Sequence, residues 1–318
     1  MENLLVNKVA AVKEVRQAAE YQKKKQACIL TGLAGSSKPV FFAAADKLLG
    51  GKGSMAFITA SREEIRTYRR ELNYLYPDLP MQELYPVSLP RVQADTQSLE
   101  LQAGRAAALR FLSGDERGIV FITAEALQQK QLRPSGMSGK ALQLAVGEEH
   151  EQRNIAAALL DLGYERTEQV DALGQFCLRG DILDVYPINS STAVRIEWFD
   201  NELDAMRSFD VDTQRSLQTL TSIKIAPLKV DESFSYDADI FEYCAADTMV
   251  VVDEPVHVFS MLEKLDKENK EHASELFGKQ ELIEQLAANG AVLVSALGHS
   301  YLQQLPSLNI PVRAVAPY

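Results

Sequence analysis

The sequence has few of the residues that build disulfide frameworks and metal sites. It contains three cysteines, Cys28, Cys177 and Cys244, which are far apart in the chain and odd in number. Three of its four histidines, at positions 257, 272 and 299, do not have the spacing of a metal-binding set. This composition argues against a disulfide framework, and it predicts a protein of the reducing cytoplasm without a bound metal.

Long apolar runs and an excess of basic residues are also lacking. No hydrophobic stretch approaches the roughly 18–20 residues that a membrane-spanning helix needs, and the first residues do not have the layout of a signal peptide. The chain carries 33 lysines and arginines against 44 aspartates and glutamates, a net charge of −11. We therefore expect no membrane partner. An autonomous DNA-binding module, which usually needs a basic face, is disfavoured, although a local patch stays open.

What the chain does have is enough apolar content for a large core. Its 318 residues, 46% of them hydrophobic, fit about two domains. Buried-strand patterns alternate with helical patterns, which predicts an α/β fold with a parallel, doubly wound sheet. The expected strands are residues 27–30, 55–59, 118–123, 220–226, 249–257, 290–295 and 310–315, and the expected helices are residues 4–22, 40–49, 61–75, 96–112, 258–270 and 280–288.

The loop after the first expected strand occupies the place of a P-loop. In the pattern G-x-x-x-x-G-K-[ST], backbone N–H groups and a lysine hold phosphates while a hydroxyl group holds magnesium. Gly32 and Lys38 keep this spacing, but Ser37 replaces the second glycine and Pro39 replaces the hydroxyl residue. Serine takes positive φ less readily than glycine, and proline has neither a hydroxyl group nor an N–H. The sequence therefore favours a degenerate P-loop with a structural role.

An acidic pair, Asp253 and Glu254, ends the expected strand near residue 250. In a motor protein such a pair would position magnesium and the attacking water. Because Pro39 cannot complete that metal site, we interpret the pair as a relic or as an acidic start to the next helix. The alternative is an ATPase or helicase-like enzyme that uses Lys38, Asp253 and Glu254.

The middle segment, residues 134–214, has a pattern of short alternating strands, which predicts a small antiparallel α+β domain. It interrupts an α/β domain made of residues 1–133 and 215–318. Arginine and aromatic side chains are enriched at protein interfaces, so some side chains here suit either an ordinary surface or a binding face. These candidates are Arg166, Arg179, Phe199 and Glu202.

Three blocks of this segment carry a family resemblance. Residues 163–166 (GYER), 176–187 (FCLRGDILDVYP) and 197–203 (EWFDNEL) resemble domain 2 of the excision-repair protein UvrB, which also occurs in the N-terminal part of the transcription-repair coupling factors, the Mfd family. The degenerate P-loop favours Mfd over UvrB. So does the short segment 85–94, where UvrB has an aromatic-rich hairpin that probes damaged DNA.

The resemblance implies a docking site for the repair protein UvrA. Arg166 and Arg179 fall at arginine positions of the family's UvrA-contacting surface, with Phe199 and Glu202 expected beside them. Cys177 stands where UvrB has a further arginine, so one charged contact is expected to be missing.

The implied function is a non-catalytic module that recruits UvrA to stalled transcription complexes, with no cofactor of its own. RNA polymerase, DNA, ATP and magnesium would engage other domains of the full-length protein, an ATP-dependent DNA translocase. The alternatives are a UvrB-like ATP-dependent enzyme and a DNA-binding repair module.

Overall fold

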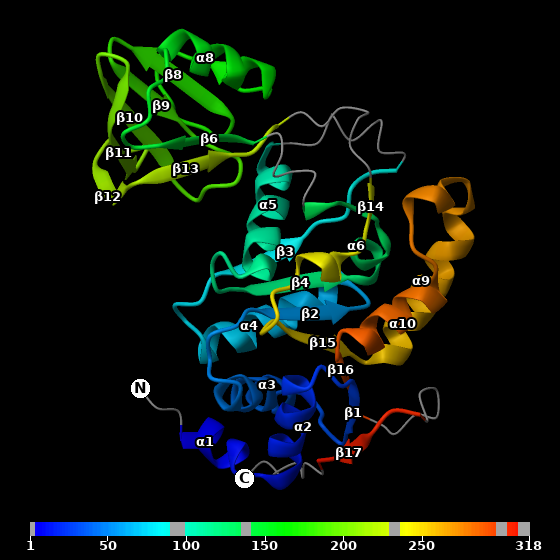
Figure 1. The fold of residues 1–318 in the computed structure, drawn as a ribbon. Helices are drawn as coiled ribbons and strands as arrows, with labels where there is room; N and C mark the ends of the chain where they lie inside the picture. Colours follow the sequence, from blue (N-terminus) through cyan, green and yellow to red (C-terminus); the bar gives the residue numbers. More distant parts are fainter. Residues whose placement is uncertain (1–3, 90–98, 135–140, 229–235, 297–303, 311–318) are drawn as a thin grey trace. The chain divides into compact units, whose positions relative to one another are not determined.

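The computed structural model describes residues 4–89, 99–134, 141–228, 236–296 and 304–310 (Figure 1). By their contacts these residues separate into two units. The first takes the residues up to 89, 108–130 and those from 239 onward, and the second takes 99–107 and 131–238. The domain limits at 134 and 215 stay predictions. The expectations for residues 90–94, 96–98 and 311–315 fall outside the described residues.

The first unit is built on a seven-stranded sheet whose described pairings are all parallel. Its inner strands are apolar on both faces, as expected where helices cover a sheet on both sides. This confirms the predicted α/β fold with a parallel sheet. In spatial order the strands are β17 (Ser307–Asn309), β1 (Cys28–Thr31), β16 (Val292–Ser295), β15 (Met249–Asp253), β2 (Met55–Thr59), β4 (Ile119–Thr123) and β3 (Met81–Leu84).

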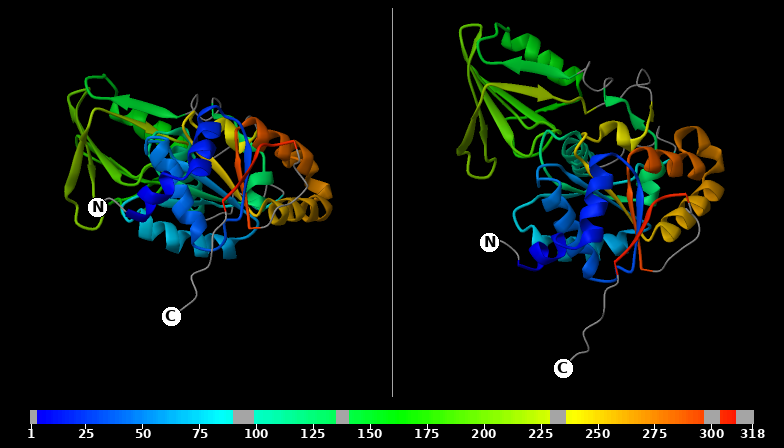
Figure 2. Two further views of the ribbon diagram at one scale, coloured as in Figure 1. Left: turned by 90° about the horizontal axis from the view of Figure 1, so that it is seen from below. Right: turned by 60° about the horizontal axis from the view of Figure 1, so that its bottom comes forward.

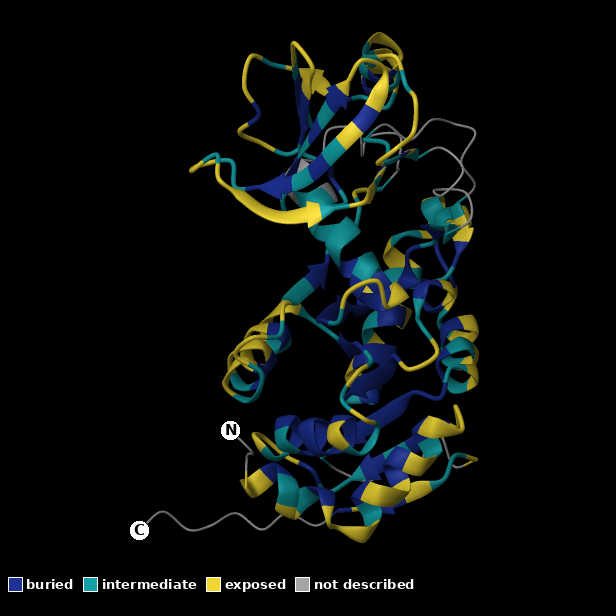
Figure 3. Cartoon of the chain, turned by 60° about the vertical axis from the view of Figure 1, so that its left-hand side comes forward, coloured by how far each residue is buried: buried dark blue, intermediate teal, exposed yellow. Residues whose placement is uncertain are grey.

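Helices cover the two faces of this sheet and enclose two apolar cores (Figures 1 and 2). Figure 3 shows the central strands as buried and the outer sides of the helices as exposed. No helix in the described ranges is both long and apolar enough to cross a membrane. One face carries α1 (Leu4–Ala10), α2 (Lys13–Lys23), α3 (Ser37–Leu48) and α4 (Arg62–Leu75); the other carries the end of α5 (Leu99–Ser113), α6 (Ala124–Gln128), η2 (Ile240–Tyr243), α9 (Pro255–Glu268) and α10 (Lys279–Ala288).

Two helices of this unit differ from the sequence expectation. The single helix expected over residues 4–22 is broken, because Val12 is extended (ψ 135°), and both α1 and α2 pack on α3. Helix α3 begins at Ser37 rather than at residue 40, so Lys38 and Pro39 lie in its first turn. Proline is tolerated there because the first-turn N–H groups have no partner within the helix. Ser61 and Glu64 form a capping box at the start of α4.

The second unit contains a six-stranded sheet in which all neighbours are antiparallel except β7 and β8. Its core face packs on α8 (Gln152–Asp161) through Ile155 and Leu159. This confirms the antiparallel region predicted for the middle of the chain. In spatial order the strands are β12 (Ser216–Leu220), β11 (Glu202–Phe209), β10 (Ala193–Phe199), β9 (Ile182–Val185), β8 (Gln175–Arg179) and β7 (Glu165–Arg166).

Smaller elements complete the two units. Strand β13 (Ser222–Ile225) pairs with β6 (Leu142–Ala145) in the second unit, whereas the sequence reading placed it in the first domain. The register is set by apolar residues, since Ile225 and Leu144 both join the core beneath α8. Two-residue β5 (Gln131–Leu132) pairs with β14 (Tyr236–Ala238), and η3 (Lys270–Glu275) follows α9.

The β10–β11 hairpin contains a bulge. Its register shifts after Glu197, so that Asp204 on β11 has no partner on β10. Because strand side chains alternate, the extra residue lets Leu203 and Met206, three positions apart, both reach the core.

Candidate functional site

The outer face of the second unit's sheet carries a row of polar side chains. Residues paired directly across neighbouring strands lie on the same face of a sheet. Cys177 pairs with Asp184, Asp184 with Arg195, and Arg195 with Arg207. The alternate residues, such as Phe176 and Leu183, fill the core on the opposite face. We call this polar surface the outer face; it consists of Cys177, Arg179, Ile182, Asp184, Arg195, Glu197, Phe199, Glu202 and Arg207.

Asp184 is the centre of an ion-pair network on the outer face. Its carboxylate is only 2% exposed. Arg195 binds it with two hydrogen bonds, from Nε to Oδ1 at 2.6 Å and from Nη2 to Oδ2 at 2.8 Å. The Arg195 guanidinium also donates to Gln214 and lies 4.8 Å from the centre of the Phe209 ring. The hydrogen bonds to Asp184 raise the pKa of Arg195, so this arginine is a fixed structural cation.

Arg179, unlike Arg195, makes little contact with Asp184 and is largely exposed. Its Nη2 donates to Asp184 Oδ2 at 3.2 Å, while 55% of its side chain is exposed. No other hydrogen bond or ion pair of Arg179 occurs within the described ranges. A guanidinium has five N–H donors in a planar fork, so most donors of Arg179 face solvent.

Phe199 and Glu202 face each other at the tip of the β10–β11 hairpin. Asp200 has a φ of 58°, and together with Asn201 it forms a tight turn. Phe199 is 77% exposed, which is unusual for so large an apolar side chain. The backbone next to Glu202 is fixed by Glu148, Glu149 and His150, which pair with the hairpin and delay the start of α8 to Gln152.

Two of the expected site residues are placed differently. Arg166 lies on the edge strand β7 and is exposed. It pairs with Phe176, so by strand alternation it lies on the opposite face of the sheet from Arg179. Cys177 lies on the outer face but is buried, and its thiol donates to the carbonyl oxygen of Glu168 at 3.0 Å. The structure thus groups Arg179, Phe199 and Glu202 by face, with Arg166 at the rim of the sheet.

The second candidate site lies at the carboxyl ends of β1, β16 and β15 in the first unit. This edge of a parallel sheet is where such folds usually bind ligands. Lys38 is buried, and its Nζ lies 2.6 Å from Asp253 Oδ1 and 2.7 Å from Glu254 Oε1. Glu254 also accepts from the Ser295 hydroxyl and from the Ala296 N–H. The predicted lysine and acidic pair therefore meet, and they are bound to each other.

The loop before Lys38 is closed by its own hydrogen bonds. The Ser37 hydroxyl group accepts from the Ala34 N–H and donates to the Ala34 carbonyl oxygen. The N–H groups of Ser37 and Lys38 donate to the carbonyl oxygens of Ala34 and Gly35. Gly32 has a φ of 86°, and a Cβ there would lie 2.7 Å from the Ile310 oxygen. Three N–H groups that a phosphate would use are thus already occupied.

The charges in this cluster stabilise one another. Burial lowers the pKa of Lys38, but Asp253 and Glu254 outweigh that effect and raise it. Burial likewise raises the pKa of Glu254, but the bonds from Lys38 and Ala296 outweigh it and lower the pKa. Burial and the charge of Asp253 raise the pKa of Tyr68, so that its hydroxyl stays protonated. The cluster is a neutral tyrosine with one cation and two carboxylates.

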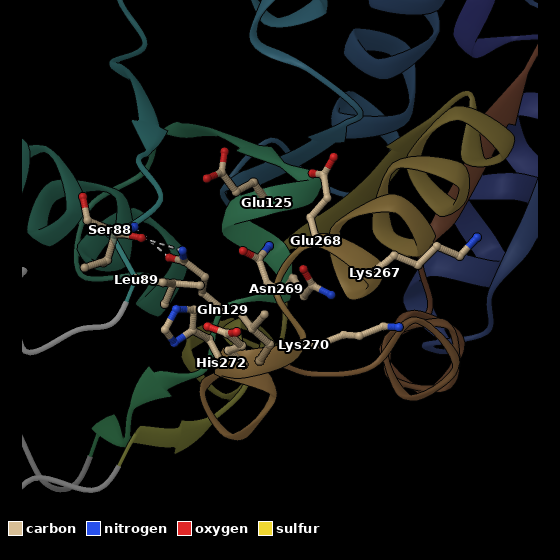
Figure 4. A pocket seen from close by; sticks show the side chains of 13 residues that line it. Ser88, Leu89, Glu125, Gln129, Lys267, Glu268, Asn269, Lys270 and His272 are labelled. Atoms are coloured by element: carbon tan, nitrogen blue, oxygen red, sulfur yellow. Dashed lines mark hydrogen bonds between the residues drawn. The ribbon is translucent and has the colours of Figure 1, made fainter.

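A cavity of about 490 Å³ lies elsewhere in the first unit, between the chain after β3, helix α6 and the segment after α9 (Figure 4). Its wall mixes both charge signs, including Glu125, Lys267 and Lys270. Gln129 is tied to the backbone of Val87 by two hydrogen bonds of 2.7 Å. Within the described ranges, no group of three or more His, Cys, Asp or Glu side chains could hold a metal ion.

Sequence reasoning missed Asp184, Arg195 and Tyr68. Asp184 interrupts the otherwise apolar strand after Gly180. A carboxylate in such a strand indicates a buried ion pair, because an unpaired buried charge is costly. Arg195 shares the alternation of Glu197 and Phe199, which would have placed it on their face. Tyr68 had no local signal, because it comes from a distant helix.

Residues 142–230 match the UvrB interaction domain family. The chain is also similar to proteins named transcription-repair-coupling factor. It is 36% identical to that of Bacillus subtilis over 63% of this chain, 32% identical to that of Staphylococcus haemolyticus over 63%, and 28% identical to that of Escherichia coli over 52%. These matches cover 17%, 17% and 14% of the relatives' lengths. Together they confirm the predicted resemblance: residues 142–230 are similar to the UvrB interaction domain, in a chain similar to proteins named transcription-repair-coupling factor.

Proposed function

We propose that this chain is a non-catalytic docking module that recruits UvrA to stalled transcription complexes. The observation that carries the proposal is Arg179, a half-exposed arginine on the outer face of the matched domain, with the exposed Phe199 on the same face. Exposed arginine and aromatic side chains on a rigid sheet are the usual anchors of a protein interface.

The exposure of Arg179 supports an acidic group on the partner surface. Three arginines, Arg179, Arg195 and Arg207, share this face with three carboxylates, Asp184, Glu197 and Glu202. The charges of the face balance, although the whole chain carries −11. Arg195 and Arg207 are engaged by Asp184 and Glu197, so Arg179 is the arginine of this face that is most exposed to a partner. Arginine can bind a partner carboxylate through two parallel hydrogen bonds.

Replacing Arg179 with glutamate tests this proposal. We expect Arg179→Glu to weaken UvrA binding by about 1–3 kcal/mol, or roughly 5- to 150-fold. The change replaces an exposed hydrogen-bond donor with a carboxylate that repels an acidic group on the partner. The measurement is a titration of purified UvrA against wild type and variant. Arg153→Glu is the matched control, since Arg153 is an exposed arginine of α8, on the other side of the sheet.

Equal affinity of Arg179→Glu and wild type, with unchanged circular dichroism, would remove Arg179 from the interface. Arg166→Glu extends the test to the rim: a loss like that of Arg179→Glu would show that the partner wraps around β7.

We also propose that the loop at Lys38 is a degenerate P-loop without catalytic activity. The lysine is bound by two carboxylates, and the loop N–H groups are bound within the loop. A phosphate would have to displace both sets of bonds and to approach two buried negative charges. These groups lie at the carboxyl ends of parallel strands, the edge where such folds usually bind ligands, so the enzyme alternative is worth testing.

Wild type and Lys38→Ala are both expected to show no magnesium-dependent ATP hydrolysis above background. A phosphate-release assay on the purified chain measures this. Hydrolysis by the wild type that disappears in Lys38→Ala would instead support the UvrB-like enzyme. Binding to RNA polymerase and DNA, and ATP-driven translocation, are proposals for a longer protein, since the chain spans about a sixth of the relatives' length.

A further inference from the structure

We propose that Asp184 is a positioning residue for docking: it holds Arg179 in the orientation that binds the partner, while Arg195 balances the charge of Asp184 and leaves the charge of Arg179 for the partner. This inference rests on the proposed UvrA-docking function of the outer face. Asp184 itself is too deeply buried to touch a partner, so its effect must pass through Arg179.

The two arginines bind the carboxylate oxygens of Asp184 unequally. Arg195 takes both oxygens at 2.6 and 2.8 Å, and its side chain is only 18% exposed. Arg179 takes a second position on Oδ2 at 3.2 Å and remains largely exposed. Asp184 is therefore charge-paired with Arg195 and serves Arg179 as a tether at one edge of its guanidinium.

Such a tether matters because a free arginine has many rotamers. Ordering a long side chain at an interface opposes binding, and fixing it beforehand removes part of that penalty. The planar guanidinium suits this role, since one edge can bond Asp184 while the other edge stays available.

Cys177 leaves the carboxylate free for this arrangement. It is the direct neighbour of Asp184 across the β8–β9 pair. Its thiol donates to Glu168, so it does not compete for the carboxylate. Among the described residues, Arg179 and Arg195 are thus the side chains that bind the carboxylate of Asp184.

The sign of the effect of Asp184→Asn on UvrA affinity tests the proposal. Removing a negative charge makes the face more positive, so charge alone predicts equal or tighter binding to an acidic partner. Loss of the tether predicts binding that is weaker by about three- to tenfold, through faster dissociation. We expect the weaker binding, measured by surface-immobilised kinetics with purified UvrA.

A double-mutant cycle separates positioning from a general structural effect. If Asp184 acts through Arg179, Asp184→Asn should add no further loss in an Arg179→Ala background. Asp46→Asn is the matched control: Asp46 is a buried carboxylate of the first unit that accepts from Arg117 and Tyr76. It should alter stability without changing UvrA affinity.

Arg179→Lys keeps the test valid if Asp184→Asn does not fold, because Arg179 is exposed. A lysine keeps the charge but cannot bond Asp184 and a partner through two opposite edges. We expect a loss of affinity close to that of Arg179→Ala. Three results would each overturn the positioning role of Asp184. They are wild-type affinity of Arg179→Lys, unchanged or tighter binding of folded Asp184→Asn, and a full additional loss in the double variant. If Arg179→Ala itself binds UvrA as wild type does, the docking face and the positioning role both fail.

Discussion

Replacing Lys38 with methionine is expected to lower the free energy of unfolding by about 3–5 kcal/mol, because it leaves two buried carboxylates without their cation. Asp253 and Glu254 both lie within 2.7 Å of the Lys38 amine and are largely shielded from water. Urea unfolding followed by far-ultraviolet circular dichroism measures the change. Lys47→Met is the control, since Lys47 is exposed on the same helix and its loss should change stability by no more than about 0.5 kcal/mol.

The same two variants test how stability depends on pH. The pKa of Lys38 is raised above its ordinary 10.5, so the contribution of Lys38 to folding stability is fully present below pH 10.5 and is lost only at higher pH. The pKa of Glu254 is lowered below its ordinary 4.5, so its contribution is present above 4.5 and is lost as the pH falls through the folded-state value.

In Lys38→Met, by contrast, Glu254 has no lysine partner, so its protonation in acid breaks no ion pair. The stability gap between wild type and variant should therefore narrow below pH 4.5. A variant as stable as Lys47→Met at neutral pH would show that the buried ion pairs add nothing to stability.

The replacement of Phe176 with alanine is expected to destabilise the second unit by about 3–5 kcal/mol, the usual effect of removing a large aromatic side chain from a packed core. Phe176 is fully buried in the core of this unit. The only tryptophan of the chain, Trp198, belongs to the same core, so its fluorescence during urea unfolding reports on this unit.

Cys177→Ala is the matched control on the next residue. It faces the smaller cluster on the outer face and removes only a sulfur atom, so we expect a loss of about 1 kcal/mol. UvrA affinity should not change, because the thiol is buried. A larger loss for Cys177→Ala than for Phe176→Ala would reverse our assignment of the two faces.

Periodicity predicted most of the fold because parallel and antiparallel sheets leave different patterns. The fully apolar strand at Met249–Asp253 and the alternating strand at Ala193–Phe199 were both recognisable for that reason. The break between α1 and α2 was not, since no glycine or proline marks it and it follows from packing on α3. The helical pattern also predicts a helix over residues 148–162, but α8 begins at Gln152 because residues 148–150 pair with a distant hairpin.

The two candidate sites were predictable to different depths. Motif spacing found Lys38, Asp253 and Glu254, but only the structure shows that they bind each other. The blocks that resemble the family suggested Arg166 and Arg179 as neighbours in one site. The register of the strands places them on opposite faces of the sheet. A sequence motif records which residues occur together, but the side of the sheet depends on pairing over long distances.

The bulge at Asp204 has a consequence for how this domain can change over evolution. An extra residue within β10 before Ile196 would turn every later side chain of that strand to the other face, burying Glu197 and exposing Trp198. The one extra residue that the hairpin does carry lies near its tip, where only Glu202 and Leu203 lie between it and the turn. Substitutions on the outer face can therefore adjust the affinity for a partner, while single insertions and deletions in β10 are excluded by the core.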